Sequence, residues 1–186
     1  SRMNDDPQHS CRPFDAHRSG FVIGEGGGAL VLETEENALA RGATIYAELA
    51  GWANNNEAYH VIKPNPDGIS SIKCMRKALL RAGLSPQDVD YINAHGTGTK
   101  LGDEGSAISS TKGATGHMMG AGGITEAIAC IQAIREGIVP PTLNLEDCDS
   151  DLDFVRGECR KMTVDTAMTN AFGFGGQNSS LIFRRY

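Results

Sequence analysis

Two histidines stand in similar settings along the chain and are the first candidates for chemistry. His95 follows an apolar run at 90–94 and opens a loop of alternating glycine and threonine, in NAHGTGT (93–99). His117 lies a few residues beyond a second apolar run, ISST (108–111), in a glycine-rich loop. A lone histidine in a turn is more often a structural cap. Because ligands bind at the carboxyl ends of strands in open α/β sheets, two histidines in equivalent positions favour a functional site.

Neither histidine has a partner at helical or C-x-x-C spacing, so a zinc site is a weak interpretation and no metal is expected. A carboxylate, Glu126, stands on the nearly apolar stretch 121–134. If that stretch is buried, Glu126 needs a hydrogen-bonding or charged partner, and Lys112 is the nearest candidate in the sequence. Such a pair could set the protonation state of the histidines, although buried Lys/Glu pairs are about as often structural.

Two glycine-rich stretches leave their roles open. NAFGFGGQN (170–178) interleaves Phe172 and Phe174 with three glycines. It is either a tight hairpin with both aromatic rings in the core or a movable apolar wall, and composition does not decide between them. GEGGG (24–28) suggests a phosphate-binding loop, but no G-K-[ST] follows it, so that interpretation is weak.

The elements that must position these residues alternate between strands and helices. Apolar residues at helical spacing predict helices at 69–82, ended by Gly83, and at 121–134, the latter inside the fold because it is nearly apolar all round. Capping signals predict shorter helical segments at 34–42 and 85–88. Strands are expected at 91–94 and 108–111, as a bent pair in 21–33, and at 45–52, 151–155, 168–171 and 180–183. The alternation predicts a layered α/β domain.

Bulk properties exclude several classes of function. The chain has 186 residues and a formal net charge of −6, without a basic cluster that would attract nucleic acid or an anionic membrane. No apolar run is long enough to span a bilayer, and the first residues lack a signal-peptide core, so we expect an intracellular protein. The cysteines form no C-x-x-C pair and are expected to be reduced thiols: Cys11, Cys74, Cys130, Cys148 and Cys159.

The motifs together resemble a known family. They are RPFDAHRSGFVIGEGGGALVLE (12–33), NAHGTGTKLGDE (93–104), SSTKGATGHMMGAGG (109–123), VPPTLNLE (139–146) and NAFGFGGQNSSLIF (170–183). In this order they closely resemble the β-ketoacyl-acyl carrier protein synthases, the elongating condensing enzymes of fatty acid synthesis, and most closely the type II synthases with a Cys-His-His site. The related polyketide ketosynthases share most of these motifs.

The resemblance implies a thiolase-like fold of two similar α/β halves, here a layered mixed sheet with helices on both faces. It implies that residues 1–44 are the end of the N-terminal half and that 45–186 form the C-terminal half. The family's nucleophilic cysteine lies in the first half, and no cysteine of this chain lies in its motif. The expected activity is decarboxylative Claisen condensation of malonyl-carrier protein with an acyl thioester, with the cysteine supplied from outside this chain.

Residue roles follow from the same resemblance. His95 and His117 match the catalytic histidines, with Lys112 and Glu126 as the supporting charged pair. The other matched positions bind the pantetheine arm or form the gating loop beside the acyl pocket: Thr97, Thr99, Phe172, Gly173, Phe174 and Gly175. No cofactor is expected beyond the phosphopantetheine of acyl carrier protein, which is the implied partner. A homodimer at full length and a bacterial cytosol or organelle matrix are also implied.

The sequence departs from the family pattern at two places. The junction at 104–107 is much shorter than the family's, which has a helix and a loop between GDE and SSTK. Gln177 stands where the family usually has threonine, in GGQN. These departures keep an alternative open, in which the chain is a catalytically silent truncated or engineered half, or belongs to a polyketide ketosynthase or its partner subunit.

Overall fold

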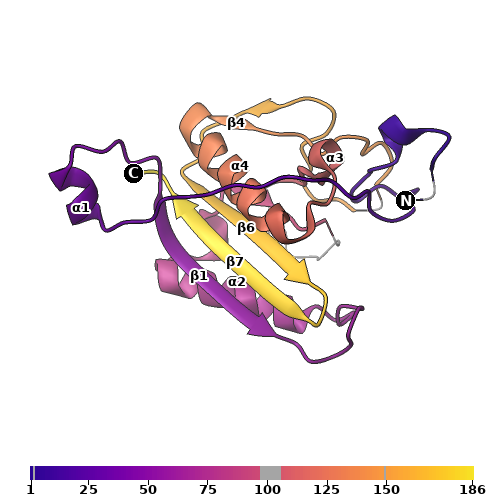
Figure 1. Cartoon of the computed structure of the whole chain (residues 1–186), viewed down its shortest axis with the longest axis horizontal. Coiled ribbons are helices and arrows are strands. Elements are labelled where there is room, and N and C mark those ends of the chain that lie inside the picture. The colour runs from indigo at the N-terminus through magenta and orange to yellow at the C-terminus, as the bar shows by residue number, and fades with distance from the viewer. Residues whose placement is uncertain (2, 97–105, 149) are drawn as a thin grey trace.

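The computed structural model describes residues 1, 3–96, 106–148 and 150–186. Its centre is a five-stranded mixed sheet in the order β1-β7-β6-β2-β3. The strands are β1 (Glu48–Asn56), β2 (Tyr91–Asn93), β3 (Ala107–Ser109), β6 (Thr166–Gly173) and β7 (Gln177–Arg184). A separate two-stranded ribbon joins β4 (Ile138–Val139) to β5 (Arg160–Lys161). Figure 1 shows β1, β6 and β7 crossing the middle of the molecule.

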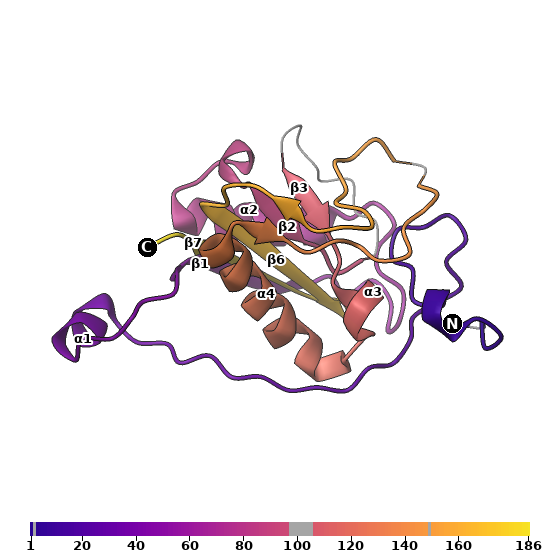
Figure 2. The ribbon, with the colours of Figure 1, turned by 90° about the horizontal axis from the view of Figure 1, so that it is seen from above.

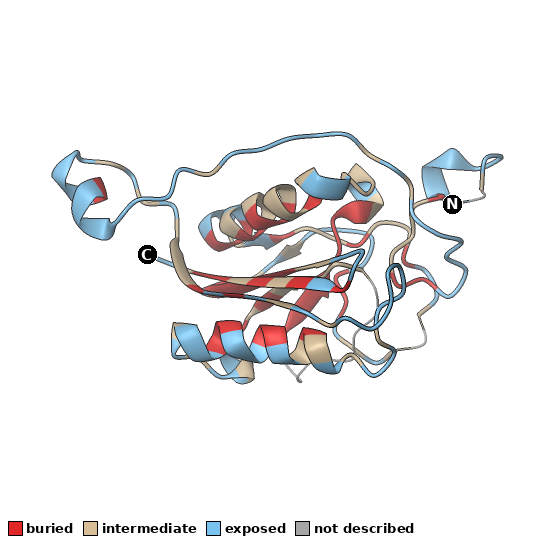
Figure 3. Ribbon diagram, turned by 60° about the horizontal axis from the view of Figure 1, so that its bottom comes forward, coloured by how far each residue is buried: buried red, intermediate tan, exposed pale blue. Residues whose placement is uncertain are grey.

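Helices cover both faces of this sheet. α2 (Ile69–Ala82) lies on one face and α4 (Gly122–Glu136) on the other, each with its buried side toward the strands (Figure 3). Shorter elements are α1 (Glu35–Ala40), α3 (Lys112–Thr115), η1 (Pro7–His9), η2 (Pro86–Asp88) and η3 (Met119–Ala121). The expected layered α/β architecture and the helices at 34–42, 69–82 and 85–88 are confirmed.

Strand direction brings separate parts of the sequence to one edge of the sheet. β2 runs parallel to both β3 and β6. The carboxyl ends of these three strands therefore meet, and the residues that follow them are His95, the 110–117 segment and the turn after Gly173. β6 and β7 form the expected antiparallel hairpin, with Phe172 opposite Asn178. Gly175 and Gly176 have φ of 81° and 79° in its turn, a backbone region that favours glycine.

Residues 21–33 do not form the expected pair of strands. They run as an extended arm along the outer side of α4 (Figure 2), and Val31 and Leu32 are 86% and 69% exposed. In the described part of the chain, the arm's one β-bridge joins Ile23 to His117. Apolar β-branched residues favour strands, but a strand also requires a neighbouring strand to take its backbone hydrogen bonds. The described residues supply none beside the rest of the arm.

Three further expectations need correction. Residues 151–155 form no strand; Phe154 only makes an isolated bridge to Ile108. β1 begins at Glu48 and runs on to Asn56, later than the expected 45–52. α4 is not buried all round: it buries Glu126, Ala127, Cys130, Ala133 and Ile134, whereas Ile124, Ile128 and Ile131 are half-buried. The apolar outer side of α4 instead faces the arm, because a Cβ on Gly28 would lie 3.1 Å from Ile124.

A buried carboxylate anchors the start of the arm. Asp15 accepts backbone hydrogen bonds from His17, Glu146 and Asp147, at 2.8, 2.9 and 3.0 Å. Burial opposes the charged form of Asp15, but these bonds and the nearby Arg12 guanidinium outweigh it and hold its pKa at about 2. Residues 10–18 are thereby fixed against the 145–147 loop. Among the described residues, no helix has the length and apolar character needed to cross a membrane.

Candidate active site

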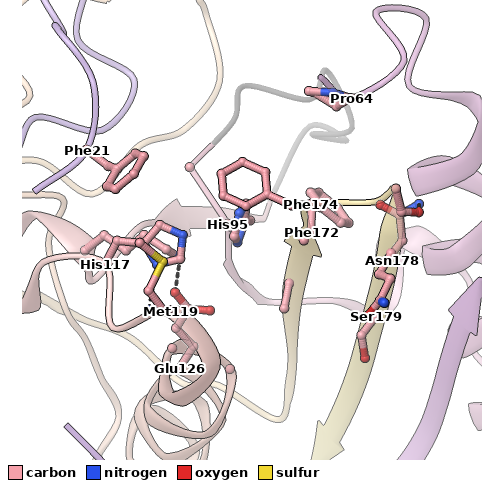
Figure 4. Close-up of a pocket in the computed structure, with 18 of the residues that line it drawn as sticks. Phe21, Pro64, His95, His117, Met119, Glu126, Phe172, Phe174, Asn178 and Ser179 are labelled. Atoms are coloured by element: carbon pink, nitrogen blue, oxygen red, sulfur yellow. Dashed lines mark hydrogen bonds and ion pairs between the residues drawn. The ribbon is translucent and has the colours of Figure 1, made fainter. Parts of the chain in front are cut away.

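The structure brings the two predicted histidines together. His95 follows β2 by one residue, after Ala94, whose N–H donates to Ser109 at 2.9 Å. His117 follows α3, and its ring meets that of His95 edge to face, with centroids 5.6 Å apart and planes at 86°. Figure 4 shows both imidazoles at one hollow, with Phe21 beyond His117 and Phe172 beside His95. His95 and His117, which are 22 positions apart in the sequence, thus line the same cavity.

This cavity has a volume of about 1210 Å³ and a mixed lining. His95, Lys112, His117 and Glu126 lie on its ionisable side, and Phe21, Phe172 and Phe174 supply aromatic surface. Amide side chains at the end of β1 and the start of β7 also line it: Asn54, Asn55, Asn56, Gln177 and Asn178. The volume is above the usual range for small-molecule sites, and the mixed lining suits a long ligand that carries both apolar and amide groups.

The tautomer of His117 follows from its hydrogen bonds. Its Nδ1 accepts the backbone N–H of Met119 at 3.1 Å. A neutral imidazole carries one proton, so that proton lies on Nε2. Partial burial, and then the positive charge of Lys112, lower the pKa of His117 below its usual value. His117 is therefore a neutral donor with its Nε2–H available to a ligand.

His95 is the more strongly perturbed group. Burial, followed by the charges of Lys112 and His117, lowers its pKa to about 3. Its Nδ1 is buried and has no hydrogen-bond partner among the described residues. His95 is consequently neutral across the physiological pH range, and it can offer a ring N–H but cannot act as a cation.

The burial of neutral His95 predicts a pH-dependent stability. Between pH 6.5 and 5 the unfolded chain binds a proton at His95 and the folded chain does not. The contribution of His95 is therefore fully present above pH 6.5 and is lost as the pH falls toward 3, by about 2 kcal/mol at pH 5. Urea unfolding of wild type and H95Q at both pH values measures this. The loss with pH should be smaller in H95Q, and equal losses in the two proteins would contradict the prediction.

Lys112 and Glu126 form the expected ion pair through Nζ and Oε1. Both are buried, at 7% and 2% exposed, and the second carboxylate oxygen, Oε2, has no partner in the part of the chain that is described. Burial raises the pKa of Glu126, and Lys112 opposes this rise. The pair lines the same cavity as the histidines, and the charge of Lys112 helps to keep both imidazoles neutral.

The hairpin turn does not bury both of its aromatic rings in the core, and the two rings differ in exposure. Phe172 is half-buried, with its ring 5.7 Å from that of His95, whereas Phe174 is 62% exposed. Gly173 lines the cavity, and Gly175 donates its backbone N–H to Val61 at 2.7 Å, outside the lining. The turn therefore presents the ring of Phe172 to the histidines, and the largely exposed ring of Phe174 also lines the cavity. Thr97 and Thr99 lie outside the described residues, so their predicted contact stays a prediction.

The sequence analysis missed several residues that line the cavity, and two of them contact His117 or Lys112. The ring of Phe21 meets that of His117 at 5.5 Å. Cys11 lines the cavity and donates its thiol to the backbone oxygen of Lys112 at 2.8 Å; burial raises the pKa of this thiol. Phe21 lies in the arm and Cys11 precedes it, and nothing in the sequence indicates that either residue packs against residues about 100 positions away. Among the described residues, no three His, Cys, Asp or Glu side chains gather as a metal site.

Comparison with known proteins agrees with this geometry. The family model for the beta-ketoacyl synthase C-terminal domain matches residues 46–105 and 104–146, and that for the N-terminal domain matches residues 2–38. The 3-oxoacyl-[acyl-carrier-protein] synthase 2 proteins of Synechocystis and Rhizobium meliloti are each 48% identical to the chain, all of which is aligned. The chain spans about half the length of these curated relatives, 49% and 48%. The alignments run over 203 and 202 residues, so the relatives carry residues that this chain lacks.

Solved structures give the same result. A beta-ketoacyl synthase from Burkholderia phymatum superposes with a TM-score of 0.92 at 41% identity, covering 100% of this chain and 49% of the other. A ketosynthase described as bound to its type II polyketide acyl-carrier protein superposes with a TM-score of 0.92 at 37% identity, covering 100% and 50%. The fold is therefore thiolase-like, as ketosynthases are. Since a family model matches more than half of its residues, the chain belongs to the β-ketoacyl synthase family.

Proposed function

We propose that this chain provides the two-histidine part of a 3-oxoacyl-acyl carrier protein synthase. The reaction extends an acyl thioester by decarboxylative Claisen condensation with malonyl-carrier protein. The observation that carries the proposal is the pair of neutral imidazoles, 5.6 Å apart in one cavity and backed by the buried Lys112–Glu126 pair. The names of relatives at 48% identity support this reaction.

The chemistry explains why neutral histidines are needed. When malonyl thioester loses carbon dioxide, the electrons of the breaking carbon–carbon bond form an enolate with negative charge on the thioester oxygen. A ring N–H that points at this oxygen, such as Nε2–H of His117, stabilises the charge as an oxyanion hole does. Each such donor contributes roughly 3–4 kcal/mol in comparable sites. The enolate carbon then attacks the acyl thioester carbonyl, and the thiolate leaves.

We propose that a nucleophilic cysteine from residues outside this sequence holds the acyl group before condensation. Three of the five cysteines of this chain are poor candidates. Burial raises the pKa values of Cys11, Cys74 and Cys130, which disfavours their thiolates. Relatives that are about twice as long have room for the missing part of the site.

Acyl carrier protein is the proposed partner, with substrates on its phosphopantetheine arm and without a further cofactor. The size of the cavity and its amide-lined wall support a long arm that contains amide groups. A structural neighbour is described as a complex of a ketosynthase with its acyl-carrier protein. A homodimer of the whole protein, and a place in the bacterial cytosol or an organelle matrix, belong to the same proposal; relatives carry bacterial, mitochondrial and chloroplastic names.

The test follows two products from one incubation. The chain is mixed with malonyl-carrier protein labelled in its free carboxyl group and with an acyl-carrier protein, and circular dichroism confirms that it is folded. We expect labelled carbon dioxide without chain extension, because the histidines stabilise the enolate but the nucleophile is not in this sequence. Labelled malonyl-carrier protein incubated without the chain is the control and measures the spontaneous release of carbon dioxide.

Other outcomes discriminate between the alternatives. Chain extension would show that this sequence can itself hold the acyl group and would overturn the proposed division of roles. No carbon dioxide from a folded chain that binds malonyl-carrier protein would contradict the enolate-stabilising role and favour a catalytically silent module.

A further inference from the structure

The segment 21–24, at the start of the arm, contacts His117 at three points. The backbone N–H of His117 donates to the carbonyl of Val22 at 2.7 Å, and the N–H of Gly24 donates to the carbonyl of His117 at 3.1 Å. The ring of Phe21 meets the imidazole edge to face at 5.5 Å. The segment therefore fixes both backbone polar groups of His117 and one side of its ring.

This contact depends on glycine at position 24. A Cβ on Gly24 would lie 2.2 Å from the carbonyl oxygen of Thr115, and one on Gly116 would lie 3.0 Å from the nitrogen of Gly24. The atoms that a Cβ on Gly24 would meet belong to the backbone, so the clash could not be relieved by moving a flexible side chain. Gly27, three positions on, has nothing within 4 Å of its Cβ position, and Gly26 would meet only the side chain of Met118.

We propose that residues 21–24 are a positioning element for His117, and that Gly24 is the residue on which it depends. The segment belongs to the region matched by the N-terminal domain model, at 2–38, and His117 to the region matched by the C-terminal domain model. A segment of the N-terminal domain thus positions His117, the hydrogen-bond donor that belongs to the C-terminal domain. The catalytic part of this inference rests on the proposed function.

Position decides the effect of such a donor. A donor contributes fully only when its N–H points at the oxygen that gains charge, and a misplacement of about 1 Å can reduce the rate on the order of 100-fold. A Cβ at 2.2 Å from an oxygen must move by about that much to reach ordinary van der Waals contact. G24A is therefore expected to displace the backbone at 115–117 and with it the imidazole.

The first test compares G24A with G27A in the malonyl-carrier protein decarboxylation assay. We expect kcat to fall on the order of 10-fold to 100-fold in G24A, with KM nearly unchanged, and G27A to match the wild type. Imidazole ¹⁵N spectra should show the Nε2–H tautomer of His117 in wild type and G27A and a mixture of tautomers in G24A. Wild-type kcat and tautomer in a folded G24A would overturn the proposal.

The second test needs neither activity nor a variant that risks unfolding. In wild type, amide hydrogen exchange at His117 and Gly24 should be as slow as in the middle of α4, and exchange at Gly27 should be fast. Fast exchange at His117 and Gly24 would mean that the segment does not hold the histidine and would overturn the proposal.

A third test uses the variant F21A, which removes an exposed ring and should raise the pKa of His117. An unchanged titration of His117 would argue against the ring contact.

These measurements separate the two proposals. Hydrogen exchange and ¹⁵N spectra report on the position of His117 even if the chain releases no carbon dioxide. An inactive wild type with a fixed His117 would contradict the proposed function and leave the positioning element supported.

Discussion

Replacing His117 by alanine is expected to lower the rate of malonyl-thioester decarboxylation at least about 100-fold, the effect typical of losing one oxyanion donor. The loss should appear in kcat, since Nε2–H donates to an oxygen that carries charge only after the carboxylate begins to leave. The half-buried side chain contributes little core surface, so the free energy of unfolding should change by less than about 1 kcal/mol. Stopped-flow detection of carbon dioxide and urea unfolding measure the two quantities.

Two variants make this result interpretable. His9 is a surface histidine paired with Asp6, away from the cavity lining, and H9A should retain wild-type decarboxylation. H117N keeps an N–H donor on a shorter side chain and should lose less activity than H117A. A rate in H117A within 3-fold of wild type would mean that the imidazole does not stabilise the enolate, and the role of the site would then have to be assigned to other residues.

The expectation for His117 could be reached from the sequence because its setting is local. The runs before His95 and His117 indicate short buried strands, and parallel strands place the residues that follow them at one edge. The helix at 69–82 and the strands at 168–171 and 180–183 were equally predictable, because periodicity and turn glycines depend on adjacent residues. Lys112 and Glu126 could be paired because a carboxylate on an apolar helix requires a partner.

The remaining features depend on contacts between distant segments. Residues 21–33 have the composition of strands, but a strand forms only beside another strand, and the sequence does not say which. The resemblance to condensing enzymes indicated that this stretch belongs to another half of the fold, and the exposed Val31 and Leu32 agree with that. Gly24 packs against Thr115, and Phe21 packs against His117. Each pair is more than 90 positions apart in the sequence, so no local pattern could indicate these contacts.

Glu126 is a position at which a single substitution should destabilise the fold strongly. E126A removes the partner of Lys112 and leaves an ammonium group, 7% exposed, without its counter-ion. Breaking a buried pair in this way costs about 3–5 kcal/mol, a large part of the stability of a domain of this size. E136A is the matched control, because Glu136 is exposed in the last turn of the same helix. Urea unfolding should separate the two variants clearly.

The double variant K112M/E126L distinguishes structure from catalysis in this pair. It removes both charges together, so it should recover most of the stability that E126A loses. It should not recover decarboxylation fully, since the charge of Lys112 lowers the pKa values of His95 and His117, and both should rise without it. Imidazole titration by NMR measures that rise. If the double variant is stable, with unchanged histidine titration and full activity, the pair is only a replaceable part of the core. If it is stable but slow, the role of the pair is to control the protonation state of the histidines.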